Sequence, residues 1–327
     1  MIKIYGIHFN RPDFVHLQSR TLKRFLKDDF EFIVVNNANT QESFEAISTA
    51  CKKESVREVG ISRNIDCNAA RAYPGYHHSI AMNEIMATEI KAHNDICVIL
   101  DGDAFLLADY SFSERMCNSS LLGALQHRKD RYWLTPVVLG FKPFELPDFD
   151  QINLIGSHVY NPTPEDSRLD LSYYPRFAGQ NYVFDCPVCT GQVDNDSEKH
   201  IPLDTGGEMY TYLRTHPEVR VAKAGSTSHI KEATVEILPQ RFRSRYNESF
   251  AFEFYDGKFL HYCRSSNWDH KTNDYHVAKT SLLLDMIEAA SSGEEKFEIS
   301  YQIPNNEWSG WPVNAMISHG VENVTAA

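Results

Sequence analysis

The sequence has 327 residues, of which 42% are hydrophobic and 23% charged, and its formal net charge is −12. This length suits one large or two small domains, and the composition excludes a disordered chain and a membrane-embedded bundle. The acidic excess repels a phosphate backbone, so we expect no nucleic acid partner. Seven cysteines, an odd number, fit a reducing compartment better than a disulfide framework.

The first residues and the apolar runs determine the expected localisation. Residues 1–9 (MIKIYGIHF) resemble neither a secretory signal peptide nor an anchor, and no later run approaches about 18 apolar residues. We therefore expect a cytoplasmic protein with no membrane span.

The first hundred residues alternate between short apolar runs and amphipathic stretches, a pattern typical of βαβ units around a parallel sheet. Residues 96–100 (ICVIL) are the most apolar run and predict a fully buried central strand. Before this run the pattern predicts strands and helices at 2–7, 11–26, 31–36, 41–53, 55–61 and 76–92.

The second half of the chain is less regular. Residues 142–200 are rich in Pro, Asp, Asn, Ser and Tyr and lack periodicity, so we expect an ordered but irregular insertion there. Regular elements are predicted again at 206–215 (helix), 219–223 (strand), 250–255 with 258–263 (hairpin) and 275–289 (helix).

Two carboxylates follow the predicted central strand, in the triplet Asp101-Gly102-Asp103. Open α/β sheets bind ligands at this edge, and residues two apart in extended chain point the same way, so both carboxylates can bind one hard cation. Gly102 lets a diphosphate approach the backbone closely. A turn role alone is the alternative, because Asp-Gly favours turns. Paired charges behind a buried strand favour function, since burying them is costly unless a partner neutralises them.

This motif, placed after a Rossmann-like first half, resembles the DxD type of GT-A glycosyltransferases, a superfamily of nucleotide-diphospho-sugar transferases. The resemblance covers about residues 1–263 and implies an α/β fold class. The implied fold is a GT-A (Rossmann-like) mixed sheet flanked by helices, with an irregular insertion and a C-terminal helical extension. It also implies a catalytic domain at 1–263, with a nucleotide-sugar-binding half at 1–110 and an acceptor half at 111–263. Residues 264–327 are expected to be an extension packed on the same domain.

The resemblance implies a metal site as well. In such enzymes the DxD motif holds a Mn²⁺ or Mg²⁺ that bridges the donor diphosphate. The second Asp usually binds the metal directly, and the first reaches the ribose or the metal. Those roles fall on Asp103 and Asp101 in this sequence. The cation would stabilise the charge that develops on the departing nucleoside diphosphate.

Polar residues near the expected donor site are candidate donor contacts. His8 and Asn10 follow the first strand and Asn36 and Asn37 end the second, where GT-A proteins hold the nucleobase and ribose. Turn chemistry explains the asparagine pair equally well. Arg264 is a candidate partner for phosphate oxygens, and an exposed arginine without a role is its alternative.

The helix before the central strand carries two further candidates. His78 and Asn83 belong to the stretch HHSIAMN, which is similar to a His-x-x-Ala-x-Asn pattern that faces the donor in some of these enzymes. His78 also shares a helical face with Met82 and Ile85, so a packed core histidine is the alternative.

An acidic residue precedes the predicted helix at 206–215. Thr205 and Glu208 form a capping box, which leaves Asp204 one residue outside the cap. GT-A enzymes hold an acidic residue near the acceptor hydroxyl in this region, and the glycines that follow leave room for a sugar. We expect Asp204 to be catalytic, as general base of an inverting reaction or as an orienting residue in a retaining one. A role near the helix cap alone is the alternative.

A histidine lies in the second strand of the predicted hairpin. Asp256-Gly257 favours a two-residue type I′ turn, which sets His261 opposite Phe252 on an apolar, inward face. Some GT-A families complete the DxD metal site with a late histidine, and residues 261–268 (HYCRSSNW) are similar to that context. His261 is therefore the expected third metal ligand, with a hydrogen-bonded core histidine as the alternative.

These residues predict a metal-dependent glycosyltransferase that moves a sugar from a nucleoside diphosphate sugar donor to a glycan or other hydroxyl acceptor, in glycan or polysaccharide synthesis. An inverting and a retaining course stay open. A HAD-like phosphohydrolase is one alternative, although its DxD strand normally opens the fold. A catalytically inactive sugar-binding module is the other. Cys186 and Cys189 have the spacing of half a zinc site without a second half, so we expect no role for them.

Overall fold

The computed structural model describes residues 1–62, 74–128, 131–154, 205–207, 209–227, 234, 237–263 and 273–297. Its strands are β1 (Ile2–His8), β2 (Phe30–Asn36), β3 (Arg57–Gly60), β4 (Cys97–Asp101), β5 (Ala104–Leu106), β6 (Leu121–Arg128), β7 (Arg131–Phe141), β8 (Val221–Ala224), β9 (Glu253–Tyr255) and β10 (Phe259–His261). Its α-helices are α1 (Pro12–Phe25), α2 (Gln41–Glu54), α3 (Pro74–Thr88), α4 (Phe112–Arg115), α5 (Met209–Thr215), α7 (Gln240–Arg243) and α8 (Asn273–Ser292). Short 3₁₀-helices are η3 (Ile90–Ala92), η4 (Pro143–Glu145), η5 (Phe149–Gln151) and η8 (Glu248–Phe250).

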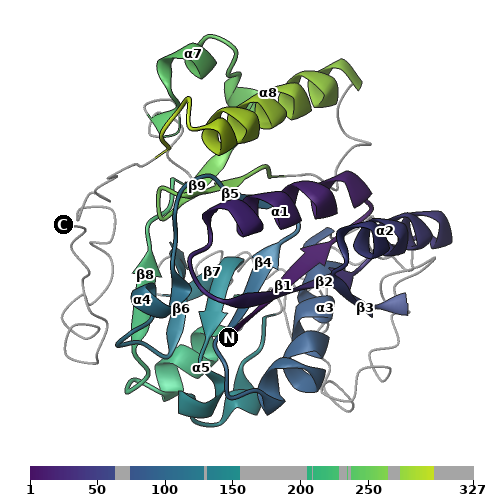
Figure 1. Cartoon of the computed structure of the whole chain (residues 1–327). Coiled ribbons are helices and arrows are strands. Elements are labelled where there is room, and N and C mark those ends of the chain that lie inside the picture. The colour runs from purple at the N-terminus through teal and green to yellow at the C-terminus, as the bar shows by residue number, and fades with distance from the viewer. Residues whose placement is uncertain are drawn as a thin grey trace, which may run out of the picture.

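A seven-stranded mixed sheet has the order β3-β2-β1-β4-β7-β6-β8 (Figure 1). Strands β1 to β4 are parallel to one another, β7 is antiparallel to both β4 and β6, and β8 is parallel to β6. The expected α/β fold class, a Rossmann-like mixed sheet flanked by helices, is thus confirmed. The most apolar run forms β4, which lies in the middle of the sheet, as its composition predicts.

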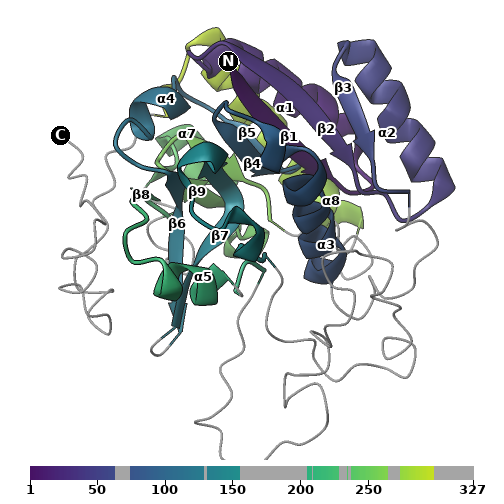
Figure 2. The same cartoon turned by 90° about the horizontal axis from the view of Figure 1, so that it is seen from below.

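This sheet separates two hydrophobic clusters because successive side chains of a strand point to opposite faces. In β1, Ile4 belongs to the cluster that includes side chains of α1, α2 and α8, whereas Tyr5 belongs to the cluster with α3 and α5. Figure 2, seen from below, shows α3 and α5 in front of the sheet and α8 behind it. No helix of the described ranges is long and apolar enough to cross a bilayer.

A second, three-stranded sheet has the order β5-β10-β9. It lies against α1, where the Phe14 and Phe105 rings meet edge to face with centroids 5.1 Å apart. Helix α8 covers α1 from outside: Arg20 pairs with Glu288 at 2.6 Å, and the buried side of α8 joins the same cluster. Because β5 begins three residues after β4 ends, the small sheet lies beside the carboxyl end of β4.

The sequence pattern predicted the elements of the first hundred residues and missed others. It gave no sign of β5 or of the long antiparallel pair β6 and β7, which completes the large sheet. The helix expected from residue 206 begins only at Met209, because Gly206 has a left-handed backbone (φ 89°) that ends regular structure. Of the expected insertion at 142–200, residues 143–151 contain η4 and η5, and residues 155–200 lie outside the described ranges.

The hairpin register differs from the expected one. His261 pairs with Glu253 and not with Phe252, because Lys258 belongs to the loop and its carbonyl accepts from the amide of Leu107 (2.8 Å). Asp256 has the expected positive φ (50°), and its carboxylate accepts from the guanidinium of Arg115 at 2.9 Å. These contacts with outside elements make the loop one residue longer than the isolated turn predicts.

Candidate functional site

The Asp101-Gly102-Asp103 turn connects the two sheets. The amide of Gly102 donates to the carbonyl of Ile7 (2.9 Å), and a Cβ at position 102 would lie 2.4 Å from that oxygen. Any side chain would therefore push the turn away from β1. Gln18 of α1 holds the turn from the other side, because its amide donates to the carbonyls of Asp101 and Ala104, both at 2.8 Å. The backbone that carries both carboxylates is thus fixed on two sides.

Two histidines from different elements contact the carboxylates. His78 of α3 places Nε2 2.6 Å from Oδ1 of Asp101. His261 places Nε2 3.2 Å from Oδ1 of Asp103 and 3.5 Å from Oδ2 of Asp101. The side chains of Asp103 and His261 are only 8% and 13% exposed, so solvent screens these contacts weakly. The structure brings together all three residues expected to bind metal, with His78 beside them.

His261 reaches the carboxylates because β5 follows the DxD turn directly and pairs with β10. In that antiparallel pair His261 lies opposite Ala104, the residue after Asp103. The amide of Tyr262 also donates to the carbonyl of Asp103 (2.8 Å). The residues are far apart in sequence, and this strand pairing alone sets them side by side.

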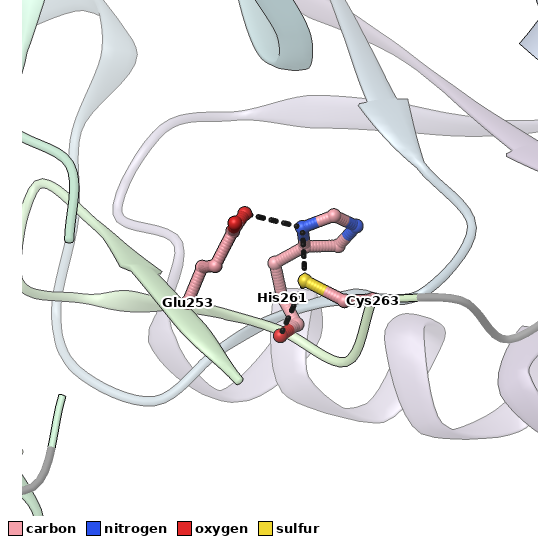
Figure 3. Close-up of side chains that lie close together, drawn as sticks. All are labelled: Glu253, His261 and Cys263. Atoms are coloured by element: carbon pink, nitrogen blue, oxygen red, sulfur yellow. Dashed lines mark hydrogen bonds and ion pairs between the residues drawn. The ribbon is translucent and has the colours of Figure 1, made fainter. Parts of the chain in front are cut away.

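The other ring nitrogen of His261 faces a second group of polar atoms (Figure 3). Nδ1 lies 3.1 Å from Oε2 of Glu253 and 3.1 Å from Sγ of Cys263. Glu253 Oε2 also accepts from the hydroxyl of Tyr255 at 2.8 Å. A carboxylate that accepts from one ring nitrogen fixes the tautomer and directs the lone pair of the other nitrogen outward, as is usual for histidine metal ligands.

The pKa values of both histidines are raised. Burial by itself lowers the pKa of His261, but its contacts with Cys263 and Asp103 outweigh burial and hold the pKa well above its ordinary value. Burial likewise opposes charge on His78, and the neighbouring Asp101 raises its pKa above the ordinary value. In the metal-free protein the two carboxylates therefore favour the protonated forms of both histidines.

The donor set fits a divalent cation. One ligand atom each from Asp101, Asp103 and His261 lies within 4.8 Å of the others, and the same holds for Glu253, His261 and Cys263. Two carboxylate oxygens and an imidazole nitrogen suit Mn²⁺ or Mg²⁺, whereas a thiolate in the set favours a softer ion. Both groups lie among the described residues and share one imidazole.

The residues at the end of β1 mainly support the turn. His8 is 1% exposed, and its Nε2 lies 3.0 Å from Oε1 of Gln18. Burial lowers the pKa of His8 to about 4, so the ring is neutral at pH 7. Asn10 has a left-handed backbone (φ 53°), and its amide donates to Asn39 at 2.6 Å. These contacts give both residues a structural role, and donor contact by them stays a prediction.

The asparagines that end β2 are buried. The amide of Asn36 donates to the carbonyl of Phe44 (2.9 Å) and to Oε1 of Glu58 (2.7 Å), so both of its hydrogens have partners inside the protein. Asn37 is 1% exposed, and its backbone amide donates to the carbonyl of His8 (2.9 Å). This arrangement favours the turn alternative for Asn36, because base binding would break internal hydrogen bonds.

Asn83 contacts residues other than the carboxylates. Its amide donates to Oδ1 of Asn153 (2.9 Å), and its oxygen accepts from the amide of Leu154 (3.1 Å). It thereby attaches the chain after η5 to α3. Of the two candidates on this helix, His78 alone contacts the acidic pair, and donor contact by Asn83 stays a prediction.

Several expected residues lie outside the described ranges, among them Asp204, Arg264, Cys186 and Cys189. Next to Asp204, the buried Gly206 would place a Cβ 2.7 Å from the carbonyl oxygen of Leu134. Close packing therefore explains this glycine without the need for a sugar.

Three residues near the carboxylates were not predicted from the sequence: Gln18, Glu253 and Cys263. Gln18 is a polar residue within the buried side of α1, between Val15 and Leu22, and that position was a usable signal. Glu253 and Cys263 gave weaker signals, since a single Glu or Cys beside a hairpin is common. Their contact with His261 depends on the observed register.

The comparisons with known proteins yield structural matches alone. No protein-family model matches the sequence, and no curated protein matches it either. One matched structure is the galactosyltransferase LgtC with donor and acceptor sugar analogs, with 11% identity, a TM-score of 0.31 and coverage of 46% of this chain and 62% of that chain. Another is an active-site mutant of LgtC, with 12% identity, a TM-score of 0.32 and coverage of 46% and 61%.

A third match is the mannosyltransferase PcManGT from Pyrobaculum calidifontis in complex with GDP-Man and Mn²⁺. It has 14% identity, a TM-score of 0.28 and coverage of 43% of this chain and 44% of that chain. The matched part spans less than two thirds of each of these proteins, and likenesses this low carry no argument about function. The chain is similar, at this distance, to structures of glycosyltransferases, the class that its DxD motif resembles.

Proposed function

We propose that this chain is a metal-dependent glycosyltransferase. Asp101, Asp103 and Nε2 of His261 would hold a Mn²⁺ or Mg²⁺ that binds the diphosphate of a nucleotide sugar. The observation that carries the proposal is the convergence of these three ligands at the carboxyl end of the central strand β4, the edge at which open α/β sheets bind ligands. When bound, the cation supplies charge stabilisation to the departing nucleoside diphosphate.

The surrounding residues prepare these ligands. Glu253 accepts a hydrogen bond from Nδ1 of His261 and keeps the ring proton there, so that a cation displacing the proton of Nε2 would find its lone pair directed toward Asp103. Gln18 fixes the backbone on both sides of the acidic pair, which keeps the carboxylates in place while substrates exchange. These residues are positioning residues, because each acts through a ligand.

His78 has a different position, since it contacts Asp101 from α3. Its Nε2 lies 2.6 Å from Oδ1 of Asp101, which leaves Oδ2 on the His261 side for a cation. A protonated His78 also offers positive charge to a phosphate at the same edge of the sheet. This charge supports a diphosphate ligand there, in agreement with the donor role that the sequence predicts.

The transferred group goes to a hydroxyl acceptor, a glycan or another alcohol. Asp204 is the proposed residue near the acceptor, as base or as orienting group, and Arg264 is a proposed phosphate contact. A HAD-like phosphohydrolase has less support, because its nucleophilic strand normally comes first in the fold and here the DxD motif follows β4. An inactive sugar-binding module would share the fold and is distinguished by assay.

The test combines a panel of nucleotide sugars with Mn²⁺, Mg²⁺ or EDTA and follows release of nucleoside diphosphate, with and without sugar acceptors. We expect release from one class of donor in the presence of metal and none in EDTA. Equal release in EDTA would contradict the metal role. Release of phosphate from phosphomonoesters would indicate a phosphohydrolase, and metal-dependent donor binding without turnover would indicate the inactive module.

A further inference from the structure

The side of His261 opposite the acidic pair holds a compact set of three metal-binding groups. Glu253 begins β9, His261 ends β10, and Cys263 follows two residues later (Figure 3). The left-handed backbone of Cys263 (φ 56°) lets its Sγ lie 3.1 Å from Nδ1 of His261. The amine of Lys279 donates to the carbonyl of Cys263 (2.8 Å), so α8 fixes this unusual conformation.

The chemistry of this set differs from that of the acidic pair. A thiol, an imidazole nitrogen and a carboxylate form the mixed donor set that Zn²⁺ prefers, with the fourth position open to water. Zinc bonds of about 2.0–2.3 Å in a tetrahedron place neighbouring ligand atoms about 3.3–3.8 Å apart. The two contacts of 3.1 Å at Nδ1 therefore need to open only slightly to admit the ion.

The geometry points to a second cation site, in which Glu253, Cys263 and Nδ1 of His261 bind Zn²⁺ and thereby inhibit binding of Mn²⁺ at Asp101 and Asp103. The zinc site rests on its own ligands. The inhibition rests on the proposed function, because it needs Nε2 of His261 to be a ligand of the second metal.

Inhibition follows from the two nitrogens of one imidazole. A neutral ring has one lone pair, so a Zn²⁺ at Nδ1 leaves the ring proton on Nε2. That nitrogen then donates to Asp103 and no longer binds a cation. Zinc coordination also removes the proton of the Cys263 thiol and the proton on Nδ1 of the charged His261 ring, and both protons pass to solvent.

Zinc binding is tested without any activity assay. The purified full chain is dialysed against Zn²⁺, and bound metal is counted by mass spectrometry, while Co²⁺ serves as a probe for thiolate absorption bands. We expect Cys263→Ser to lose one equivalent of zinc and the thiolate band. Cys117→Ser, at an exposed free thiol, is the matched control and keeps both. An unchanged zinc count and band in Cys263→Ser would overturn the site and indicate thiols elsewhere, such as Cys186 and Cys189.

A second variant tests the zinc site independently, in case Cys263→Ser loses zinc because it misfolds. Glu253→Gln keeps the thiol and the size of the side chain but removes one charged ligand. We expect its zinc affinity to fall by about tenfold or more with the thiolate band intact. Wild-type zinc affinity in Glu253→Gln would remove the carboxylate from the site.

Inhibition is measured by electron paramagnetic resonance of Mn²⁺. We expect one equivalent of Zn²⁺ to release bound Mn²⁺ from the wild-type protein, and Cys263→Ser to need at least about tenfold more Zn²⁺. The same Zn²⁺ requirement in both proteins would overturn the inhibition. Failure of Mn²⁺ to bind before zinc is added would instead contradict the proposed function and leave the zinc measurement intact.

Discussion

At the carboxyl edge of the seven-stranded sheet, polar side chains bond to neighbouring parts of the fold: Asn10 to the loop residue Asn39, and Asn36 to α2 and β3. In the three-stranded sheet, Glu253 and His261 point to one another, and the other nitrogen of His261 contacts the acidic pair. The histidines of the two sheets differ in the same way. His8 is neutral because burial lowers its pKa, whereas His261 is charged because nearby acidic groups raise its pKa.

The difference shows that position at the ligand-binding edge is a poor guide to chemistry by itself. Loops after parallel strands need buried side chains to satisfy their backbone groups, and after β2 the side-chain oxygen of Asn36 accepts from the amide of Ala38 (3.4 Å). The charged groups gather where a second sheet contacts the end of β4. Four predictions test this contrast, beginning with the largest expected effect.

Asp103→Asn removes a charged ligand at the contact of the two sheets and keeps its size. We expect Mn²⁺ affinity and metal-dependent release of nucleoside diphosphate to fall by about 10²–10³-fold. Calorimetric titration with Mn²⁺ and the donor assay measure both. Asp109→Asn, at an exposed carboxylate, is the control. Wild-type Mn²⁺ affinity in Asp103→Asn would show that the acidic pair beside the small sheet does not bind the metal.

The neutral state of His8 predicts a loss of stability in acid. Because its pKa is about 4 in the folded protein and 6.5 ordinarily, the unfolded chain binds a proton between these values that the folded chain excludes. The contribution is complete above pH 6.5, is lost as pH falls through 4, and is worth about 3 kcal/mol. We expect His8→Gln to reduce the fall in unfolding free energy between pH 6.5 and 4, measured by urea denaturation. Equal falls in both proteins would show that His8 is not held neutral.

Asn36→Ala tests whether the β2 asparagine is structural. The change leaves the carboxylate of Glu58 and the carbonyl of Phe44 without this donor, so we expect a loss of about 1–3 kcal/mol in unfolding free energy. Donor affinity per folded molecule should stay normal. Weakened donor affinity with normal stability would contradict the structural role and indicate that Asn36 contacts the nucleotide.

Glu253→Gln is the mildest change, because the amide oxygen still accepts from Nδ1 of His261. The lost charge lowers the basicity of the ring, and we expect Mn²⁺ affinity to fall by about tenfold. Resonance titration of free Mn²⁺ in zinc-free buffer measures it. Glu58→Gln, in β3 beside β2, is the comparison and leaves Mn²⁺ affinity unchanged. An equal loss in the two variants would indicate a general change in charge.

Local patterns predicted much of the site. The apolar run of β4 places Asp101 and Asp103 at the carboxyl edge of the sheet, and the resemblance named His261 as the third metal ligand and His78 as a donor contact. It failed for Glu253 and for the asparagine contacts. The hairpin register was one residue off because Lys258 bonds Leu107, a residue distant in sequence.

The sequence by itself determined the elements whose signal is local, because burial of one helix face imposes a repeat of apolar residues, as in α1, and burial of both strand faces imposes a continuous apolar run, as in β1 and β4. Tertiary structure decided which side chains meet. His261 contacts Asp103 because β5 and β10 pair, and Cys263 contacts His261 because its backbone is left-handed and anchored by Lys279. Such contacts join residues that no local repeat relates, so the packing of the two sheets sets the chemistry of the site.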